Sequence, residues 1–157
     1  MPIFREAQTS DLPAICALGE EVNAIHHAAF PHVFAGRGAP DAAASHWSAS
    51  IAQANATTFV AEQEGQVVGF VTVGISDESN PLVQPARVGR VGSIGVTEAA
   101  RGRGVGSELM RHAQAWLASR GAQEVRLNVW QFNAGALRLY QELGYEVRSV
   151  QLARRLQ

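Results

Sequence analysis

A glycine-rich segment at residues 96–107, VTEAARGRGVGS, lies between an expected strand and a long expected helix. The first backbone N–H groups of a helix have no partner inside it, and they lie at the positive end of the helix dipole. Glycines there carry no Cβ atom that would hold an anion away from the backbone, and Arg101 and Arg103 add positive charge at the rim. The segment therefore predicts an anion-binding turn within a protein of the α/β class.

Two familiar phosphate-binding loops do not fit this segment. A Walker loop requires a lysine followed by serine or threonine, and all thirteen basic residues of the chain are arginine. The dinucleotide fingerprint requires a glycine at its sixth position, which is Ser107 when counted from Gly102 and Leu109 when counted from Gly104. A glycine-rich turn with surface arginines and no ligand is the structural alternative.

Hydrophobic periodicity and turn residues predict the remaining elements. A β-hairpin is expected from strands 57–63 and 66–76, with a tight turn at Glu64 and Gly65. Residues 87–97 are expected to form a strand whose glycines permit a bulge, the close approach of a ligand, or simply a bent strand. We also expect strands at 3–7 and 123–130, a final hairpin from the tail 145–154, helices at about 12–25, 41–55, 104–120 and 134–143, and loops at 26–40 and 77–86. Without repeats or a linker, residues 1–157 are expected to form one domain.

Charge and cysteine content narrow the class of protein. The net charge of -1 argues against a nucleic-acid-binding protein, which normally carries a strong basic excess. Cys16 is the single cysteine, so no intrachain disulfide can form, and a reducing compartment fits best. The first residues lack the pattern of a secretory signal, and no apolar stretch approaches the ~20 residues of a membrane span. We therefore expect a cytoplasmic protein without a membrane partner.

Two sequence blocks carry a resemblance to a known family. The pattern Arg101-x-x-Gly104-x-Gly106, just after an expected strand, resembles the cofactor signature of the GCN5-related N-acetyltransferase (GNAT) family. Residues 133–145, NAGALRLYQELGY, resemble that family's N-x-x-A-x-x-L-Y-x-x-x-G-[FY] helix, and hairpin 57–76 resembles its core strands. The resemblance implies a mixed, mostly antiparallel twisted sheet of six or seven strands, flanked by about four helices, with two central parallel strands splayed to admit the cofactor.

The resemblance also implies acetyl-CoA as the cosubstrate and no metal. The diphosphate would lie on the amides of the turn from Arg103 to Ser107, with the pantetheine arm along residues 94–96 like an extra strand. Unpaired N–H groups of Ile94 and Val96 would bind the thioester oxygen as it becomes an oxyanion. Asn133 is expected to cap its helix and is a candidate contact of the pantetheine. The implied cofactor-binding residues are Ile94, Gly95, Val96, Arg101, Gly102, Arg103, Gly104, Val105, Gly106, Ser107 and Asn133.

By the same resemblance, Tyr140 is the expected general acid, which protonates the departing thiolate. The structural alternative is a tyrosine packed on its helix face. The general base is less defined, because some family members place a glutamate on the glycine-rich strand and this chain has no acidic residue between Arg87 and Thr97. The candidates for this role are Glu62, Asp77, Glu78, His26 and His27, and Glu62 is the one we assign with Tyr140 as catalytic.

The implied activity is direct transfer of the acetyl group to a primary amine. Residues 20–48 should shape the acceptor pocket, and their histidines and aromatic residues suit a small organic amine or a peptide end. The tail lacks the tyrosine-rich strand of ribosomal N-terminal acetyltransferases, which favours a metabolite or an aminoglycoside-like amine. The alternatives are a protein or peptide N-terminal or lysine acetyltransferase, and a non-catalytic acyl-CoA-binding sensor domain. A homodimer is a further possibility, because dimers are common in the family.

Overall fold

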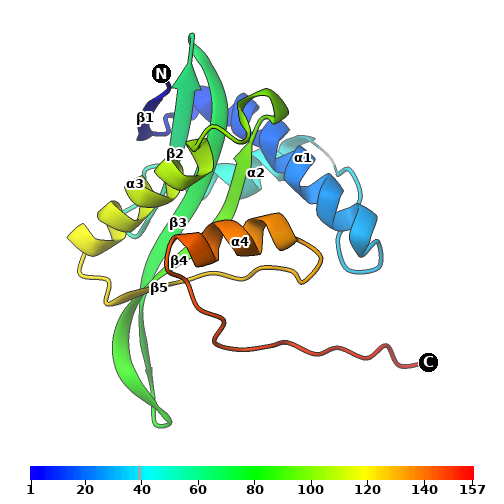
Figure 1. Ribbon diagram of the computed structural model, residues 1–157, viewed down its shortest axis with the longest axis vertical. Helices are drawn as coiled ribbons and strands as arrows, with labels where there is room; N and C mark the ends of the chain where they lie inside the picture. Colours follow the sequence, from blue (N-terminus) through cyan, green and yellow to red (C-terminus); the bar gives the residue numbers. More distant parts are fainter. Residues whose placement is uncertain (39) are drawn as a thin grey trace.

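The computed structural model describes residues 1–38 and 40–157, which form one mixed sheet with helices on both faces (Figure 1). The strands follow the order β1-β2-β3-β4-β5, and every neighbouring pair is antiparallel except β4 and β5, which are parallel. The strands are β1 (Ile3–Glu6), β2 (Ala56–Gln63), β3 (Gln66–Asn80), β4 (Val83–Val96) and β5 (Glu124–Arg126). The helices are α1 (Leu12–Ala29), α2 (Pro40–Ser48), α3 (Val105–Ser119) and α4 (Ala134–Glu142), with short 3-10 turns at Thr9–Asp11 and Glu98–Ala100.

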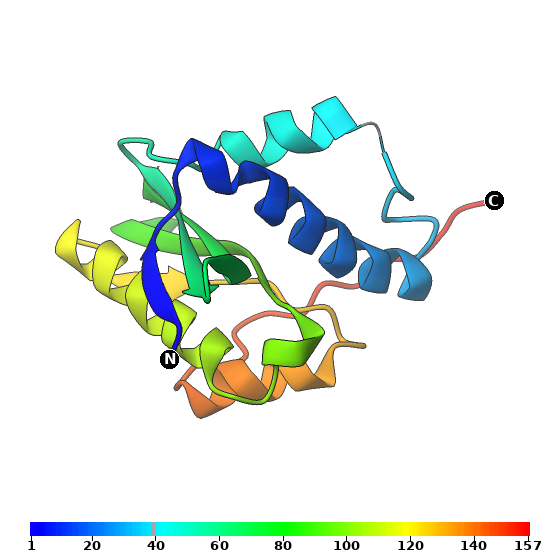
Figure 2. The same ribbon diagram turned by 90° about the horizontal axis from the view of Figure 1, so that it is seen from above.

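Two hydrophobic clusters lie on opposite faces of the sheet. Successive side chains of a strand point to opposite faces, so Val60 and Phe70 pack with α1 while Ala61 and Val71 pack with α3. Figure 2 shows α1 and α2 on one side of the sheet and α3 and α4 on the other. The sheet therefore forms the middle of three layers, and β4 lies between helices of both outer layers.

The hairpin of β2 and β3 confirms its prediction from turn chemistry. Gln63 pairs with Gln66, and Glu64 and Gly65 both have positive φ angles, of 52° and 75°. Positive φ at both central residues defines a type I′ turn, whose twist matches that of the flanking strands. The turn fixes where β2 and the central strand β3 begin to pair.

The number of strands differs from the expectation of six or seven. The sheet has five, and its parallel pair lies at an edge rather than at the centre. Strand β5 has three of the eight residues expected at 123–130, because the chain leaves β4 after Arg126. The tail from Tyr145 forms neither strand nor helix, since Val150 and Leu152 are exposed and have no sheet face to cover.

Residues 77–86, expected as a loop, instead extend β3 and β4 into the long projecting hairpin of Figure 1. Asp77 pairs with Arg87 and Asn80 with Val83. Pro85 lies at a register shift, where its missing N–H costs no ladder bond. The sequence expectation failed because polar residues are compatible with a strand whose faces are exposed to solvent, as they are in this projecting hairpin.

Two helix boundaries also differ from expectation. Helix α1 continues to Ala29, and so takes in the first residues of the loop expected at 26–40; residue 39 of that loop lies outside the described residues. Helix α2 ends at Ser48 rather than near residue 55, and Ile51 then turns into the core beside α1. No helix within the described ranges is both long enough and apolar enough to cross a membrane.

Candidate functional site

The parallel strands β4 and β5 part at the edge of the sheet. Within the described residues they pair only from Val88 with Glu124 to Arg90 with Arg126. Strand β4 nevertheless continues to pair with β3 as far as Val96. A gap therefore opens between β4 and the segment that follows β5, at the place where the family resemblance implies the thioester.

A bulge in β4 accompanies this parting. Thr72 of β3 faces both Gly92 and Ser93, and its Oγ1 accepts a hydrogen bond of 2.9 Å from the Ser93 N–H. A bulge bends a strand and increases its twist, which turns β4 away from β5. Sequence reasoning did not single out Thr72, because its role depends on the cross-strand register.

The backbone beyond the bulge directs two N–H groups into the gap. The Thr97 N–H donates to the Val68 carbonyl of β3 at 2.9 Å. Alternate residues of a strand direct their N–H groups to the same neighbour, so the N–H of Gly95 also points to β3. The N–H groups of Ile94 and Val96 then point away from β3, toward the gap. Two such donors can hold a developing oxyanion.

The glycine-rich turn leads from this strand to α3 through a left-handed backbone. Gly102 and Gly104 have φ angles of 71° and 80°, which favour glycine strongly. Gly104 is the N-cap of α3 and supplies no side-chain cap, so the N–H groups of residues 105–107 are open to an anion. Arg101 donates from Nε to the Val96 carbonyl at 2.9 Å, which ties the turn to the end of β4.

Helix α4 lies beside this turn and carries the tyrosine of the second motif. Asn133 caps the helix, as expected, with its Oδ1 accepting from the Ala136 N–H at 3.1 Å. Leu139 approaches Gly106 of α3, at 3.6 Å from the position that a Cβ would take there. The same position is 3.9 Å from Val96, so strand, turn and α4 meet at the end of the gap.

Tyr140 is buried between α4 and α3. Its side chain is 6% exposed, and burial raises the pKa of its phenol to about 12. The ring packs edge-on against Tyr145 at 5.9 Å between centroids, and the Tyr145 hydroxyl accepts a hydrogen bond from Gln114 at 2.8 Å. The Tyr140 phenol therefore stays protonated at neutral pH and retains its proton for donation.

Glu62 lies away from the gap. Arg5 of β1 donates to its carboxylate from Nη2 at 2.6 Å and from Nε at 3.0 Å. The same guanidinium binds both oxygens of Asp11, at 2.7 and 2.9 Å, and this hydrogen bonding lowers the pKa of Asp11. Strand β3 separates β2 from β4. The structure thus places Glu62 in a network that joins β1, β2 and the start of α1.

The other candidate bases divide into two groups. Asp77 pairs with Arg87 at 3.1 Å and Glu78 with Arg126 at 2.5 Å, both beside the projecting hairpin. His26 and His27 instead lie in the last turns of α1, and His26 contacts Phe132 on the other side of the gap. Of these candidates, His26 therefore combines a basic ring nitrogen with a contact to the segment that follows β5, whereas His27 bonds the Phe34 carbonyl.

A cluster of rings forms beside the gap from two distant parts of the sequence. His26, Phe30 and Phe34 come from α1 and the residues that follow it, while Trp130 and Phe132 follow β5. Trp47, one of the aromatic residues of 20–48 expected at the acceptor pocket, packs instead on Phe70 at 5.3 Å and over Gly19 in the core.

A shallow hollow of about 470 Å³ lies between α1 and α2, away from the gap. Cys16 lines it, and burial raises the pKa of the Cys16 thiol above its ordinary value. Glu20 and Arg37 also line it and pair with each other at 3.2 Å. A thiol held in its protonated form is a poor nucleophile, which fits a packing role for Cys16.

Comparison with known proteins identifies the family. The model of the acetyltransferase (GNAT) family matches residues 20–145. The chain therefore belongs to the GNAT acetyltransferase family.

Similar curated proteins include a mycothiol acetyltransferase of Amycolatopsis mediterranei, with 38% identity over 87 residues, covering 55% of this chain and 29% of that protein. A streptothricin acetyltransferase of Streptomyces lavendulae is 34% identical over 93 residues, covering 59% of this chain and 46% of that protein. The chain thus spans less than half the length of these relatives.

The fold is also that of solved structures. A mutant of the BH1408 protein from Bacillus halodurans superposes with a TM-score of 0.92 at 20% identity, covering 99% of both chains. Aminoglycoside N-acetyltransferase AAC(6')-Iy in complex with CoA superposes with a TM-score of 0.79 at 20% identity, covering 99% of this chain and 95% of that one. At such identity the likeness concerns the fold alone.

Proposed function

We propose that residues 1–157 form a single N-acetyltransferase domain that moves the acetyl group of acetyl-CoA directly onto the primary amine of a small molecule. The observation that carries the proposal is the parting of β4 and β5 next to the open N-terminus of α3. Outward N–H groups of Ile94 and Val96 lie at one end of this arrangement, and uncapped helix N–H groups lie at the other. An extended thioester with a diphosphate matches both ends.

The cofactor residues follow from this match. The diphosphate is expected on the N–H groups of Val105, Gly106 and Ser107, with Arg103 and the remaining guanidinium N–H groups of Arg101 at its rim. Gly102 and Gly104 give the turn its left-handed backbone. The pantetheine then runs along residues 94–96 past Asn133.

The reaction needs an oxyanion site and an acid. The amine nitrogen attacks the thioester carbonyl carbon, and the negative charge on the oxygen is held by the N–H groups of Ile94 and Val96. The C–S bond then breaks, and the thiolate takes a proton from the Tyr140 phenol. The nitrogen, which became positively charged when it formed the new C–N bond, loses one proton to water. Tyr140 is reprotonated from solvent. Glu62 has no part in this scheme, because Arg5 holds its carboxylate in another part of the sheet.

The comparisons favour a small-molecule acceptor over a protein. The relatives are named for acetylation of streptothricin and mycothiol, and the solved neighbour for aminoglycosides. These names describe those proteins; for this chain they support a metabolite or aminoglycoside-like amine.

The test combines binding with turnover. Calorimetry should show one site per chain for acetyl-CoA, and a panel of primary amines should include acceptors that release free CoA thiol. Absence of acetyl-CoA binding would refute the proposed function. Tight binding with no thiol release for any amine would support the sensor domain in its place.

A further inference from the structure

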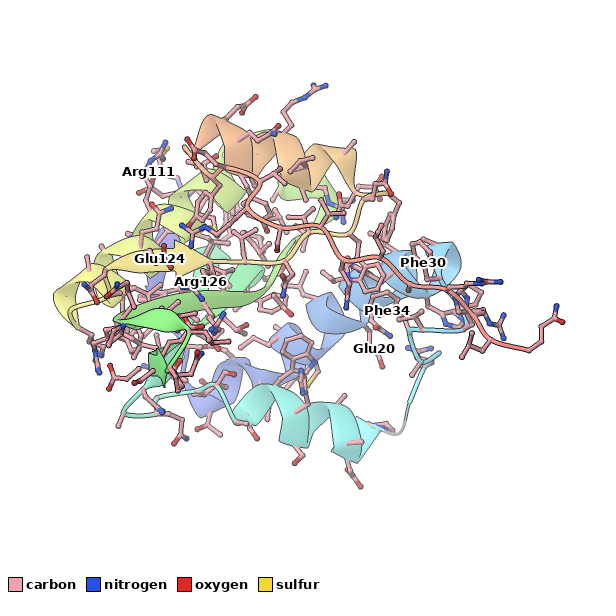
Figure 3. All side chains as sticks on the ribbon, turned by 90° about the horizontal axis from the view of Figure 1, so that it is seen from below. Glu20, Phe30, Phe34, Arg111, Glu124 and Arg126 are labelled. Carbon is pink, nitrogen blue, oxygen red and sulfur yellow. The ribbon has the colours of Figure 1, made fainter. Side chains whose placement is uncertain are left out.

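In the ring cluster beside the gap, each of the five rings contacts two others. Phe34 lies 4.7 Å from Trp130 and 5.0 Å from His26, and Phe30 lies 5.3 Å from Trp130 and 5.8 Å from Phe132, between ring centroids. All five rings are half-buried, so each keeps part of its surface open to solvent. Figure 3 shows Phe30 and Phe34 on the opposite side of the view from Glu124 and Arg126, where β5 still pairs with β4.

Helix α1 places His26 next to the strand that lines the gap. Val22 packs directly over Gly95, with its Cγ2 at 2.9 Å from the position that a Cβ of Gly95 would take. His26 is one helical turn further along the same face of α1. Its ring also contacts Phe132 at 5.3 Å, from the segment that leaves β4. His26 therefore lies on the helix that packs over β4, and its ring contacts the segment that parts from β4.

The hydrogen bond of His26 determines its tautomer. Its Nδ1 lies 2.7 Å from the Val22 carbonyl oxygen, which can only accept a hydrogen bond. Nδ1 therefore carries the proton, and in the neutral ring Nε2 carries a lone pair. The backbone bond also fixes the ring orientation, so the base is oriented before an acceptor arrives.

We propose that this ring cluster is the acceptor subsite, that it takes a primary amine carried on an apolar body, and that Nε2 of His26 is the base that deprotonates it. The inference rests on the proposed acetyl transfer. It also supplies a general base, which the glycine-rich part of β4 cannot provide because it has no acidic residue.

The chemistry of the cluster selects the acceptor. Ring faces attract a single ammonium group and pack well against an apolar body. The five rings of the cluster bring no carboxylate, and Glu20, six residues before His26 on α1, is paired with Arg37 at 3.2 Å. A polyamine or an aminoglycoside would leave several ammonium groups without a counter-charge here, which costs binding free energy. A monoamine avoids that cost.

The proton balance is complete. The ammonium group of the acceptor gives one proton to His26 Nε2, and the freed lone pair forms the bond to the acetyl carbon. The thiolate that leaves receives a proton from Tyr140, the new amide nitrogen loses its second proton to water, and Tyr140 is reprotonated from solvent. The imidazolium releases its proton to solvent after the step. One proton is released overall.

The decisive variant is His26→Asn, because the amide N–H can still donate to the Val22 carbonyl while no basic nitrogen remains. We expect kcat/KM to fall about 100-fold with 2-phenylethylamine, which is an ammonium ion at pH 7. With p-anisidine, an arylamine that is already neutral at pH 7, the fall should be no more than about threefold. The matched control is His27→Asn, since His27 makes the same kind of bond, 2.7 Å from Nδ1 to the Phe34 carbonyl, on the neighbouring position.

Each outcome decides the assignment of the base. Equal losses with the two amines, no loss with either, or the same loss in His27→Asn would overturn it. Loss of acetyl-CoA affinity or of thermal stability in His26→Asn would assign the residue to the fold instead. Wild-type protein that releases no thiol with any amine would refute the proposed acetyl transfer itself. Calorimetry would then separate a chain that binds acetyl-CoA without turnover from one that does not bind it.

The substrate class has its own test. For the wild-type protein, kcat/KM with 2-phenylethylamine should exceed that with spermidine or kanamycin by at least about tenfold. Trp130→Leu should raise KM for 2-phenylethylamine about tenfold and leave the Kd of acetyl-CoA unchanged. A preference for the polycationic amines would overturn the apolar monoamine while leaving the role of His26 to be judged by its own variant.

Discussion

At the scale of single residues, Tyr140 illustrates how burial prepares a side chain for one role. The phenol is withdrawn from water, and its pKa is raised to about 12, so it carries its proton at neutral pH and is a weaker acid than a free tyrosine. We expect Tyr140→Phe to lower kcat about 100-fold and to leave the Kd of acetyl-CoA unchanged. Thiol release and calorimetry on the same preparation measure both. An unchanged kcat would remove Tyr140 from the mechanism.

The same burial makes stability depend on pH in the alkaline range. An unfolded tyrosine titrates near pH 10, whereas folded Tyr140 titrates at about 12, so the unfolded chain loses its proton first. The stabilising contribution is complete below pH 10 and is lost as the pH rises toward 12, at a cost of up to about 2 kcal/mol. Urea titrations at pH 8 and pH 11 should show a smaller loss for Tyr140→Phe than for wild type. Burial of Tyr145 leaves the variant with some pH dependence.

Glu62 illustrates the opposite case, a carboxylate engaged by the fold. Arg5 binds Glu62 and the buried Asp11 together, so removing one partner disturbs the joint between β1 and β2. We expect Glu62→Gln to lower the free energy of unfolding by about 1 kcal/mol and to change kcat less than about threefold. Denaturant titration and the thiol assay measure the two effects. A large loss of kcat at unchanged stability would restore Glu62 as a base.

At the scale of elements, the turn into α3 depends on its left-handed glycines. A Cβ at Gly104 is strained by its φ of 80°, at a cost of about 1–2 kcal/mol, and the altered turn would displace the first N–H groups of α3. We expect Gly104→Ala to weaken acetyl-CoA binding at least about tenfold. Gly135→Ala in α4 is the control, since a Cβ there meets open space and its affinity should be unchanged. Equal affinity in both variants would contradict the anion site.

Local sequence signals predicted the elements that depend on local physics. The type I′ turn at Glu64 and Gly65 and the start of α3 each follow from residues within a few positions. The bulge opposite Thr72 could not be predicted, because it requires knowing which residue of β3 faces Ser93. The parting of β4 and β5 was implied only by the family resemblance. Strands of the tail were expected wrongly, since alternation in a sequence does not supply a neighbouring strand.

The site shows the same division. The glycine turn before α3 and the cap of α4 by Asn133 were predicted from residue type and position, whereas phosphate binding at that turn stays a prediction. The ring cluster joins residues about a hundred positions apart, so its composition was visible in the sequence but its assembly was not. The β4 glycines also gained a specific reason: Leu117 lies over Gly89 and Val22 over Gly95, both closer than a Cβ would allow.

At the scale of the whole molecule, the segment after α4 contrasts with the packed layers. Residues 149–157 are exposed and belong to no helix or strand, and Figure 1 shows the chain running away from the sheet there. Among the described residues, the bidentate pair of Arg148 with Glu124 is the last side-chain hydrogen bonding between this segment and β5. We expect trypsin to cut after Arg154 and Arg155 well before it cuts after Arg111 inside α3, because cleavage requires an open backbone. Mass spectrometry over a time course measures the order, and simultaneous cleavage would show that the layers open as readily as the tail.

In the proposed reaction, helix α1 would set two distances at once, because Val22 packs over Gly95 of β4 and His26, one turn further on, carries the proposed base. The spacing between nucleophile and electrophile is then a property of one rigid rod rather than of two mobile loops. New acceptors could accordingly evolve through exchange of the surrounding rings, while the geometry of bond formation stays constant.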